Sequence, residues 1–193
     1  MDNDNKAAKF CYPYPHAAIT ADCIVFGYDP NKTLRVLLVK RRNEPYKDCW
    51  AFPGGFMEID EDLETCARRE VLEETGMALG EGFQFRSYSA VDRDPRERVI
   101  TVVHFAFEAL AEVKGSDDAA EARWFDIDNL PELAFDHRTI IHELFEFLED
   151  VIYNDLFFKY SPEGIPIEAL RKLTTDILHL KELERPPIDD DTL

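Results

Sequence analysis

A Pro-Gly-Gly sequence that ends a strand, followed by a capped helix, is the feature that most limits how this sequence can fold. Pro53-Gly54-Gly55 closes a short apolar strand, because proline and glycine disfavour its continuation. The residues that follow predict a helix from Asp60 to Thr75, with Asp60 as N-cap and acidic side chains near the positive end of the helix dipole. Gly76 predicts the end of the helix, since glycine readily adopts the left-handed conformation found there.

Runs of β-branched and aromatic residues predict strands on both sides of this helix. Ala17–Tyr28 and Leu34–Arg42 flank a turn and should form a hairpin. Further strands are expected at residues 83–91, 97–110 and 121–127, and amphipathic patterns predict helices at 136–157 and 167–183. The predicted fold class is therefore α/β of the α+β type, a mixed β-sheet core with one central helix and additional C-terminal helices.

Three glutamates of the predicted helix point in the same direction as its small and apolar residues, which is not expected of a solvent-exposed face. Each residue turns the side-chain direction by about 100°, so Glu70, Glu73 and Glu74 share a stripe with Cys66 and Ala67. That stripe carries small and apolar residues and should face the sheet. Burial of unpaired carboxylates is unfavourable, and their mutual repulsion would raise their pKa values.

Ion pairs with Arg68 and Arg69, or a divalent cation, could offset this repulsion. A solvated glutamate and arginine face is the alternative interpretation. Oxygen ligands without histidine or cysteine favour a hard ion, Mg²⁺ or Mn²⁺, which commonly acts on phosphates. The Gly54-Gly55 pair lets the backbone approach a ligand and can offer a carbonyl oxygen to the metal.

Composition excludes several classes of protein. The net charge of −18 argues against a protein whose main role is to grip a nucleic-acid backbone, which needs a basic face. The four cysteines show neither a C-x-x-C pair nor the spacing of a zinc site. We expect no signal peptide and no membrane span, which needs roughly 18 consecutive apolar residues, and therefore a cytoplasmic protein.

Gly55, Glu61 and the run Arg69–Met77 resemble the complete Nudix signature, with every fixed position filled at its fixed spacing. The strand pattern extends the resemblance over Ala17–Leu133. It implies a Nudix-like mixed sheet sandwiched by helices. The expected division is an N-terminal extension at 1–16, a Nudix hydrolase domain at 17–134, and a C-terminal helical appendage with an acidic tail at 135–193.

The resemblance also implies roles for individual residues. Members of this family hydrolyse nucleoside diphosphates linked to another group, X, by attack of water on one phosphorus of the pyrophosphate. Arg69 would orient the carboxylates, and Glu61 would support the geometry of the loop and helix. The Mg²⁺ or Mn²⁺ ligands would be the Gly54 carbonyl and the carboxylates of Glu70, Glu73 and Glu74.

The general base of this family often comes from a loop late in the core. Asp117 and Asp118 are the candidates by position, and Asp92, Asp94 and Glu97 come behind them. Each of these residues could instead be an ordinary loop acid.

The group X would be recognised outside the signature. Residues 88–101 resemble a segment of family members that act on ADP-ribose and of their regulatory relatives. Arg93, Arg96 and Arg98 could clasp phosphates there, since guanidinium binds phosphate in a bidentate manner; a charged hairpin loop is the alternative. Tyr46 and Phe56 could stack on a base.

Two functions remain open. The first is a metal-dependent pyrophosphohydrolase that acts on ADP-ribose or a similar compound. The second is a ligand-binding regulator, because residues 133–150 resemble the linker helix of bacterial Nudix-type repressors, which carry a winged helix after the core. The complete signature, the short C-terminal region and the acidic charge favour the hydrolase. We expect a nucleotide substrate, no nucleic acid or membrane partner, and a homodimer.

Overall fold

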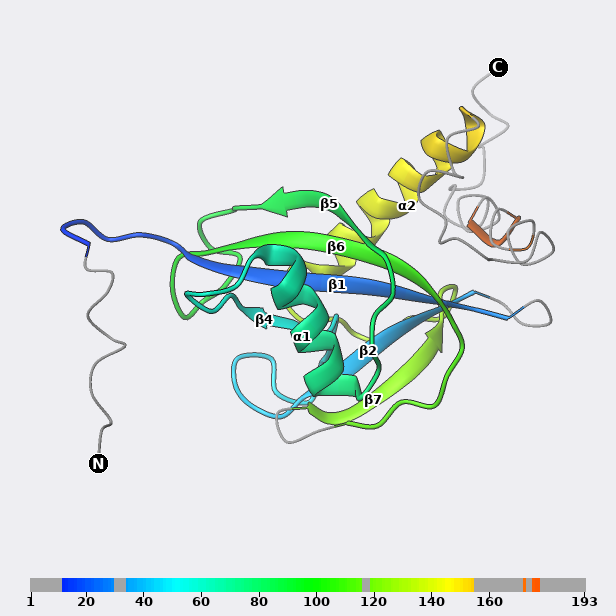
Figure 1. The fold of residues 1–193 in the computed structure, drawn as a ribbon, viewed down its shortest axis with the longest axis horizontal. Helices are drawn as coiled ribbons and strands as arrows, with labels where there is room; N and C mark the ends of the chain where they lie inside the picture. Colours follow the sequence, from blue (N-terminus) through cyan, green and yellow to red (C-terminus); the bar gives the residue numbers. More distant parts are fainter. Residues whose placement is uncertain (1–11, 30–33, 116–118, 155–171, 173–174, 178–193) are drawn as a thin grey trace, which may run out of the picture.

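The computed structural model describes residues 12–29, 34–115, 119–154, 172 and 175–177 (Figure 1). Its elements in chain order are β1 (Ala18–Tyr28), β2 (Arg35–Arg41), β3 (Trp50–Ala51), β4 (Gly54–Phe56), α1 (Leu63–Thr75), β5 (Gly82–Tyr88), β6 (Val99–Ala109), β7 (Ala119–Asp126) and α2 (His137–Tyr153). The strands form one sheet with the order β3-β2-β1-β6-β5, to which β4 adds by pairing with β1 and β7 by pairing with β2.

The sheet is mixed, as the sequence predicts. β1 and β6 run parallel along their whole length, from Ala18 opposite Val99 to Tyr28 opposite Ala109. The other pairs are antiparallel, and they include the predicted hairpin of β1 and β2. A parallel pair requires a long crossover, and the segment between β1 and β6 carries β2 to β5 and α1.

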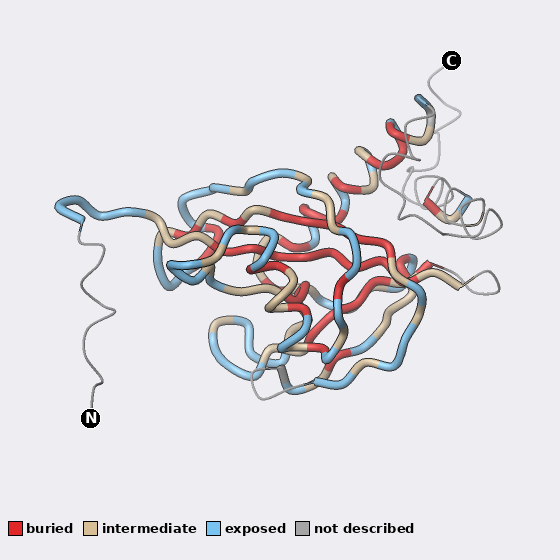
Figure 2. Tube along the Cα trace, viewed as in Figure 1, coloured by how far each residue is buried: buried red, intermediate tan, exposed pale blue. Residues whose placement is uncertain are grey.

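Two hydrophobic clusters lie on the two faces of the sheet, because successive strand residues point to opposite sides. Cys23 and Val25 of β1 pack in one cluster with the buried residues of α1. Ile24 and Phe26 pack in the other with Ile140, Ile141, Leu144 and Leu148 of α2. The two helices therefore cover opposite faces of the sheet, and the buried segments run through its centre (Figure 2).

Helix α1 begins later than the sequence predicts. Asp62, and not Asp60, is its N-cap, and the Asp62 carboxylate accepts a hydrogen bond of 2.8 Å from the Thr65 amide. Asp60 lies instead in a turn where the Glu58 amide donates to the Glu61 carboxylate at 2.8 Å. The predicted end is confirmed, since Gly76 has φ 72° and donates to the Leu72 carbonyl.

The C-terminal predictions are tested only in part. The amphipathic helix predicted at 136–157 is observed as α2, with Ile140, Leu144 and Leu148 fully buried. The helix predicted at 167–183 lies largely outside the described residues. Among the helices of the described chain, none is long and apolar enough to cross a membrane.

Candidate functional site

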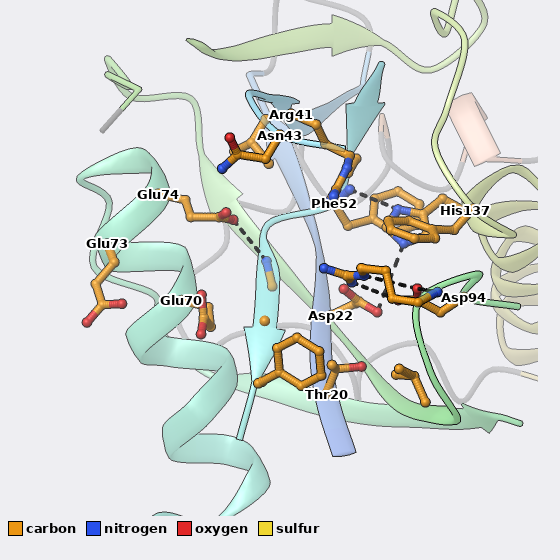
Figure 3. A pocket seen from close by; sticks show the side chains of 18 of the residues that line it. Thr20, Asp22, Arg41, Asn43, Phe52, Glu70, Glu73, Glu74, Asp94 and His137 are labelled. Atoms are coloured by element: carbon orange, nitrogen blue, oxygen red, sulfur yellow. Dashed lines mark hydrogen bonds and ion pairs between the residues drawn. The ribbon is translucent and has the colours of Figure 1, made fainter. Parts of the chain in front are cut away.

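A pocket of about 580 Å³ opens where β4 lies between α1 and β1 (Figure 3). Helix α1 contributes carboxylates to one side, and β1 contributes Thr20 and Asp22 on the other side of β4. The remaining wall comes from the end of β2, the loop before β6, and the start of α2. The pocket thus brings together residues from widely separated parts of the chain.

Two glycines of β4 make this arrangement possible. A Cβ atom on Gly55 would lie 2.5 Å from Oε1 of Glu70. A Cβ atom on Gly54 would lie 2.6 Å from Oδ1 of Asp22. Any side chain at either position would therefore collide with a carboxylate of the pocket, so glycine is required at both positions. The predicted approach of this backbone to a ligand stays a prediction.

Arg69 is the centre of a network on the α1 side. Its guanidinium donates to Glu61 at 2.7 and 3.0 Å, to Glu70 at 2.7 Å and to Glu73 at 3.0 Å, and also to the Phe56 carbonyl at 3.1 Å. This cation holds the pKa of Glu61 at about 2. Arg69 and Glu61 therefore tie the loop to α1, as the Nudix resemblance implies.

The pKa values of the Glu70 and Glu74 carboxylates are both raised. Burial raises the pKa of Glu74 to about 8, although the Gly54 amide donates to its Oε2 at 3.0 Å. Burial also raises the pKa of Glu70, against the opposing effect of Arg69. Additional positive charge close to these two groups would stabilise their ionised forms.

The predicted phase of the glutamates is only partly right. The buried stripe of α1 consists of Cys66, Ala67, Val71 and Thr75. Glu70 and Glu74 border this stripe and are partly buried, whereas the side chain of Glu73 is 58% exposed. The helix is rotated so that Val71 faces the sheet, which moves Glu73 toward solvent.

The donor set on α1 fits a hard divalent cation in kind, because it offers carboxylate oxygens and, on β4, the Gly54 carbonyl. In the structure Arg69 holds Glu70 and Glu73, and Glu74 turns to the Gly54 amide. No three histidine, cysteine or acidic side chains in the described part of the chain converge on one point. Binding of a metal would therefore replace some of the hydrogen bonds that Arg69 makes to Glu70 and Glu73.

Arginine and aromatic side chains form another wall. Arg96 lies over the rings of Phe56 and Phe135, 5.6 and 5.9 Å from their centroids, and pairs with Asp94 at 2.7 Å. Arg41 lies over the Phe135 ring at 4.7 Å. Burial, followed by the nearby charge of Arg96, lowers the pKa of Arg41. The wall therefore holds two cations that repel each other.

The predicted substrate residues divide into two groups. Arg93, Arg96 and Phe56 line the pocket, although Arg93 is buried and makes a bidentate ion pair with Asp136 at 2.7 and 3.0 Å. Tyr46 is not among the lining residues, and its exposed ring lies 4.7 Å from that of Phe135, centroid to centroid. The Arg98 guanidinium donates to backbone carbonyls, including that of Ser89 at 2.8 Å, and does not line the pocket.

The candidates for the general base also separate. Asp117 and Asp118 lie outside the described residues. Asp94 lines the pocket and forms an ion pair with Arg96. Asp92 and Glu97 are exposed and do not line the pocket. The general base stays a prediction.

The lining residues that the sequence interpretation misses include Asp22, Arg41, Phe135 and His137. Asp22 did carry a signal, because it is a charged residue on the strand face that continues with Ile24. The other three gave none, since they join the site through contacts across the fold and belong to no local pattern.

His137 links the start of α2 to the pocket floor. Its Nδ1 accepts a hydrogen bond of 3.1 Å from the Phe52 amide, and its ring stacks on Phe52 with centroids 4.5 Å apart. Burial lowers the pKa of His137, so the neutral ring carries its proton on Nε2, which lies 4.0 Å from Oδ2 of Asp22.

Comparison with known proteins gives three informative similarities. An ADP-ribose pyrophosphatase from Methanocaldococcus jannaschii is 44% identical over 130 residues, which cover 67% of this chain and 74% of that protein. The ADPR responsive transcriptional repressor NtrR of Acinetobacter baylyi is 34% identical over 173 residues, 86% of this chain and 68% of the repressor. The crystal structure of a MutT/nudix family protein from Enterococcus faecalis superposes with a TM-score of 0.77 at 28% identity, covering 91% of this chain and 80% of that one.

The family model for the NUDIX domain matches residues 18–144. This range runs from the first residue of β1 into α2, and it contains every residue of the pocket described above. The resemblance read from the signature is confirmed: the chain belongs to the Nudix family.

Proposed function

We propose that this chain is a divalent-metal-dependent pyrophosphohydrolase that cleaves a nucleoside diphosphate linked to another group, with ADP-ribose as the preferred substrate. The observation that carries the proposal is the pairing of opposite charges in one pocket. Carboxylates of α1 line it together with Arg41 and Arg96. Such a pocket suits a pyrophosphate that is held by metal and guanidinium groups together. The similarity to the M. jannaschii ADP-ribose pyrophosphatase supports the choice of substrate.

Glu70, Glu73, Glu74 and the Gly54 carbonyl would hold the cation, which we propose to be Mg²⁺ or Mn²⁺. When bound, such an ion supplies Lewis-acid charge to phosphate oxygens and lowers the pKa of bound water. Arg69 keeps the carboxylates in place through its hydrogen bonds to Glu70 and Glu73.

Arg41 and Arg96 would neutralise phosphate oxygens, and Phe56 would offer an aromatic surface to the nucleoside. Water attacks one phosphorus, the bridging P–O bond breaks, and two monophosphates leave. Asp117 and Asp118 remain the proposed sources of the general base. Arg93 would act through Asp136 and the loop before β6, as a positioning residue.

The test is hydrolysis by the purified chain of ADP-ribose, dinucleotides, nucleotide sugars and nucleoside triphosphates, with Mg²⁺, with Mn²⁺ and with chelator. We expect metal-dependent cleavage of ADP-ribose to AMP and ribose 5-phosphate. Absence of metal-dependent turnover with every compound would overturn the proposed activity. Turnover of triphosphates alone would overturn the preference for ADP-ribose.

A ligand-responsive regulator is the second candidate, because the similarity to the A. baylyi repressor covers 86% of this chain. Against it stands the net charge of −18, which opposes contact with DNA. We therefore propose that the protein binds no specific DNA. We propose separately that it acts in the cytoplasm as a homodimer. A nanomolar, salt-sensitive shift of a palindromic operator fragment, reversed by ADP-ribose, would establish the regulator instead.

A further inference from the structure

Buried polar residues occupy the pocket end of β1, where the rest of the same face is apolar. Thr20 and Asp22 are each 8% exposed, and the same face continues with Ile24 and Phe26, which are fully buried in the core. Thr101 of β6 lies opposite Thr20 in the register and is fully buried. We call Thr20, Asp22 and Thr101 the polar floor.

Some polar atoms of the polar floor have hydrogen-bond partners and others have none among the described residues. The Thr101 hydroxyl donates to Oδ2 of Asp22 at 2.5 Å, which sets the orientation of the carboxylate. The other oxygen, Oδ1, lies beside Gly54 and receives no hydrogen bond from the described residues. The buried Thr20 hydroxyl has no partner in the described part of the chain either.

Asp22 forms no ion pair with a lysine or arginine of the described residues, although the charge of Arg41 attracts it from a greater distance. No lysine or arginine nitrogen of the described residues lies within 4.0 Å of its carboxylate. His137 is the nearest basic group, and burial keeps it neutral. Buried polar groups without partners destabilise a fold, so a purely structural role gives no reason to place Thr20 and Asp22 here.

The chemistry of the polar floor selects the kind of ligand group that fits it. A carboxylate oxygen accepts hydrogen bonds and repels phosphate, so the pyrophosphate belongs near the arginines and near the cation that the α1 carboxylates are proposed to hold. Adjacent hydroxyl groups of a sugar donate to a carboxylate, as in the recognition of ribose by an acidic residue in dinucleotide-binding folds. Figure 3 shows Thr20 and Asp22 across β4 from Glu70 and Glu74. A group bound over the polar floor would therefore lie next to a pyrophosphate bound on the α1 side of the pocket.

We propose that Asp22, oriented by Thr101 and assisted by the Thr20 hydroxyl, binds the hydroxyl groups of a ribose that adjoins the pyrophosphate. The proposal rests on the proposed function, because the pyrophosphate subsite fixes where this ribose lies. Asp22 and Thr20 are then specificity residues, and Thr101 is a positioning residue.

The test combines the Asp22→Asn variant with three substrates. They are ADP-ribose, its analogue with 2′,3′-dideoxyadenosine, and the ADP ester of n-pentanol, which has no hydroxyl group on X. We expect Asp22→Asn to lower kcat/KM for ADP-ribose by about 10- to 100-fold, mainly through KM, as for the loss of a hydrogen bond to a charged group. The loss should vanish with the one analogue that lacks the hydroxyls bound by Asp22, which identifies the ribose.

Control measurements separate this role from two others. Asp126→Asn makes the same change on β7, outside the pocket, and should leave kcat/KM unchanged. The Mg²⁺ concentration for half-maximal rate should be the same in Asp22→Asn and wild type. An equal loss with all three substrates, no loss at all, or a shifted Mg²⁺ requirement would overturn the proposal.

Thr20→Val tests the same idea without changing charge. Valine removes a buried hydroxyl that has no partner, so the ligand-free protein should melt at an equal or slightly higher temperature while KM for ADP-ribose rises. A lower melting temperature with unchanged KM would make Thr20 structural and contradict its part in the proposal.

Calorimetric titration of ADP-ribose in chelator distinguishes failure of this inference from failure of the proposed function. A wild type that binds ADP-ribose in chelator but does not cleave it with Mg²⁺ or Mn²⁺ refutes the hydrolase, and Asp22→Asn should still weaken that binding. Unchanged binding by the variant refutes the polar floor alone. A wild type that neither binds nor cleaves ADP-ribose refutes both.

Discussion

The two helices that cover the sheet differ in what they bury. Helix α2 places Ile140, Leu144 and Leu148 fully inside the core. Helix α1 buries small residues, among them Cys66 and Ala67, and carries carboxylates along the border of its buried stripe. Helix α2 therefore stabilises the fold, whereas α1 gives up some stability to hold charge beside the pocket.

The largest difference between the two helices is expected in stability, from a substitution on α2. Leu144→Ala removes a fully buried side chain and should lower the free energy of unfolding by about 2–5 kcal/mol. Leu72→Ala on α1 is the matched control, because Leu72 is 51% exposed, and it should change stability far less. Denaturant titrations of both variants make the measurement. Equal losses would remove the distinction between the helices.

The next effect should appear in catalysis on α1. Glu70→Gln keeps the shape of a proposed metal ligand and removes its charge, so kcat/KM for ADP-ribose should fall by about 10²- to 10³-fold. Glu64→Gln is the control on the same helix, since Glu64 is exposed, pairs with Arg68 and lies outside the pocket. Steady-state rates with saturating Mg²⁺ decide the matter, and similar rates for both variants would exclude Glu70 from the metal site.

A smaller effect is expected at the end of β2. Arg41→Ala should raise KM by about 10-fold, because the Arg41 guanidinium faces the pocket and pairs with no carboxylate among the described residues. Arg35→Ala removes the same charge at the other end of β2, where Arg35 pairs with Asp126 at 2.8 Å. KM values for ADP-ribose compare the two, and an unchanged KM in Arg41→Ala would argue against phosphate binding there.

The sequence predicted what local patterns encode. The strands, the end of α1 at Gly76, and the network of Arg69 with its glutamates all lie in short segments whose spacing sets their geometry. The N-cap was misplaced by two residues, because Asp60 and Asp62 are chemically equal candidates and only the turn closed by Glu58 and Glu61 decides between them.

The rest of the pocket depends on contacts between distant segments. Phe135 and His137 meet Arg41 and Phe52 only after α2 has docked on the sheet. The prediction that Glu73 faces the sheet was wrong for a related reason. The packing of Val71 determines which side of α1 faces the sheet. Spacing on a helix defines relative directions, and tertiary packing defines which direction is inward.

We propose that the carboxylates of α1 repel one another when no metal is bound and thereby form a cation site. Burial raises the pKa of Glu74 from 4.5 in the unfolded chain to about 8 in the folded one. The folded state therefore binds this proton more tightly, and the associated stability is present below pH 4.5 and is lost as pH rises through 8. Glu74→Gln should be free of this loss.

Thermal melts of wild type and Glu74→Gln test this claim most directly. In chelator at pH 9, Glu74→Gln should be more stable than wild type by on the order of 1 kcal/mol, and the difference should shrink at pH 5. With excess Mg²⁺ the order should reverse, because the wild type gains more stability by binding the ion to its native state. A variant that is less stable than wild type in chelator at pH 9, with no greater response of wild type to Mg²⁺, would make Glu74 a structural residue and exclude it from a cation site.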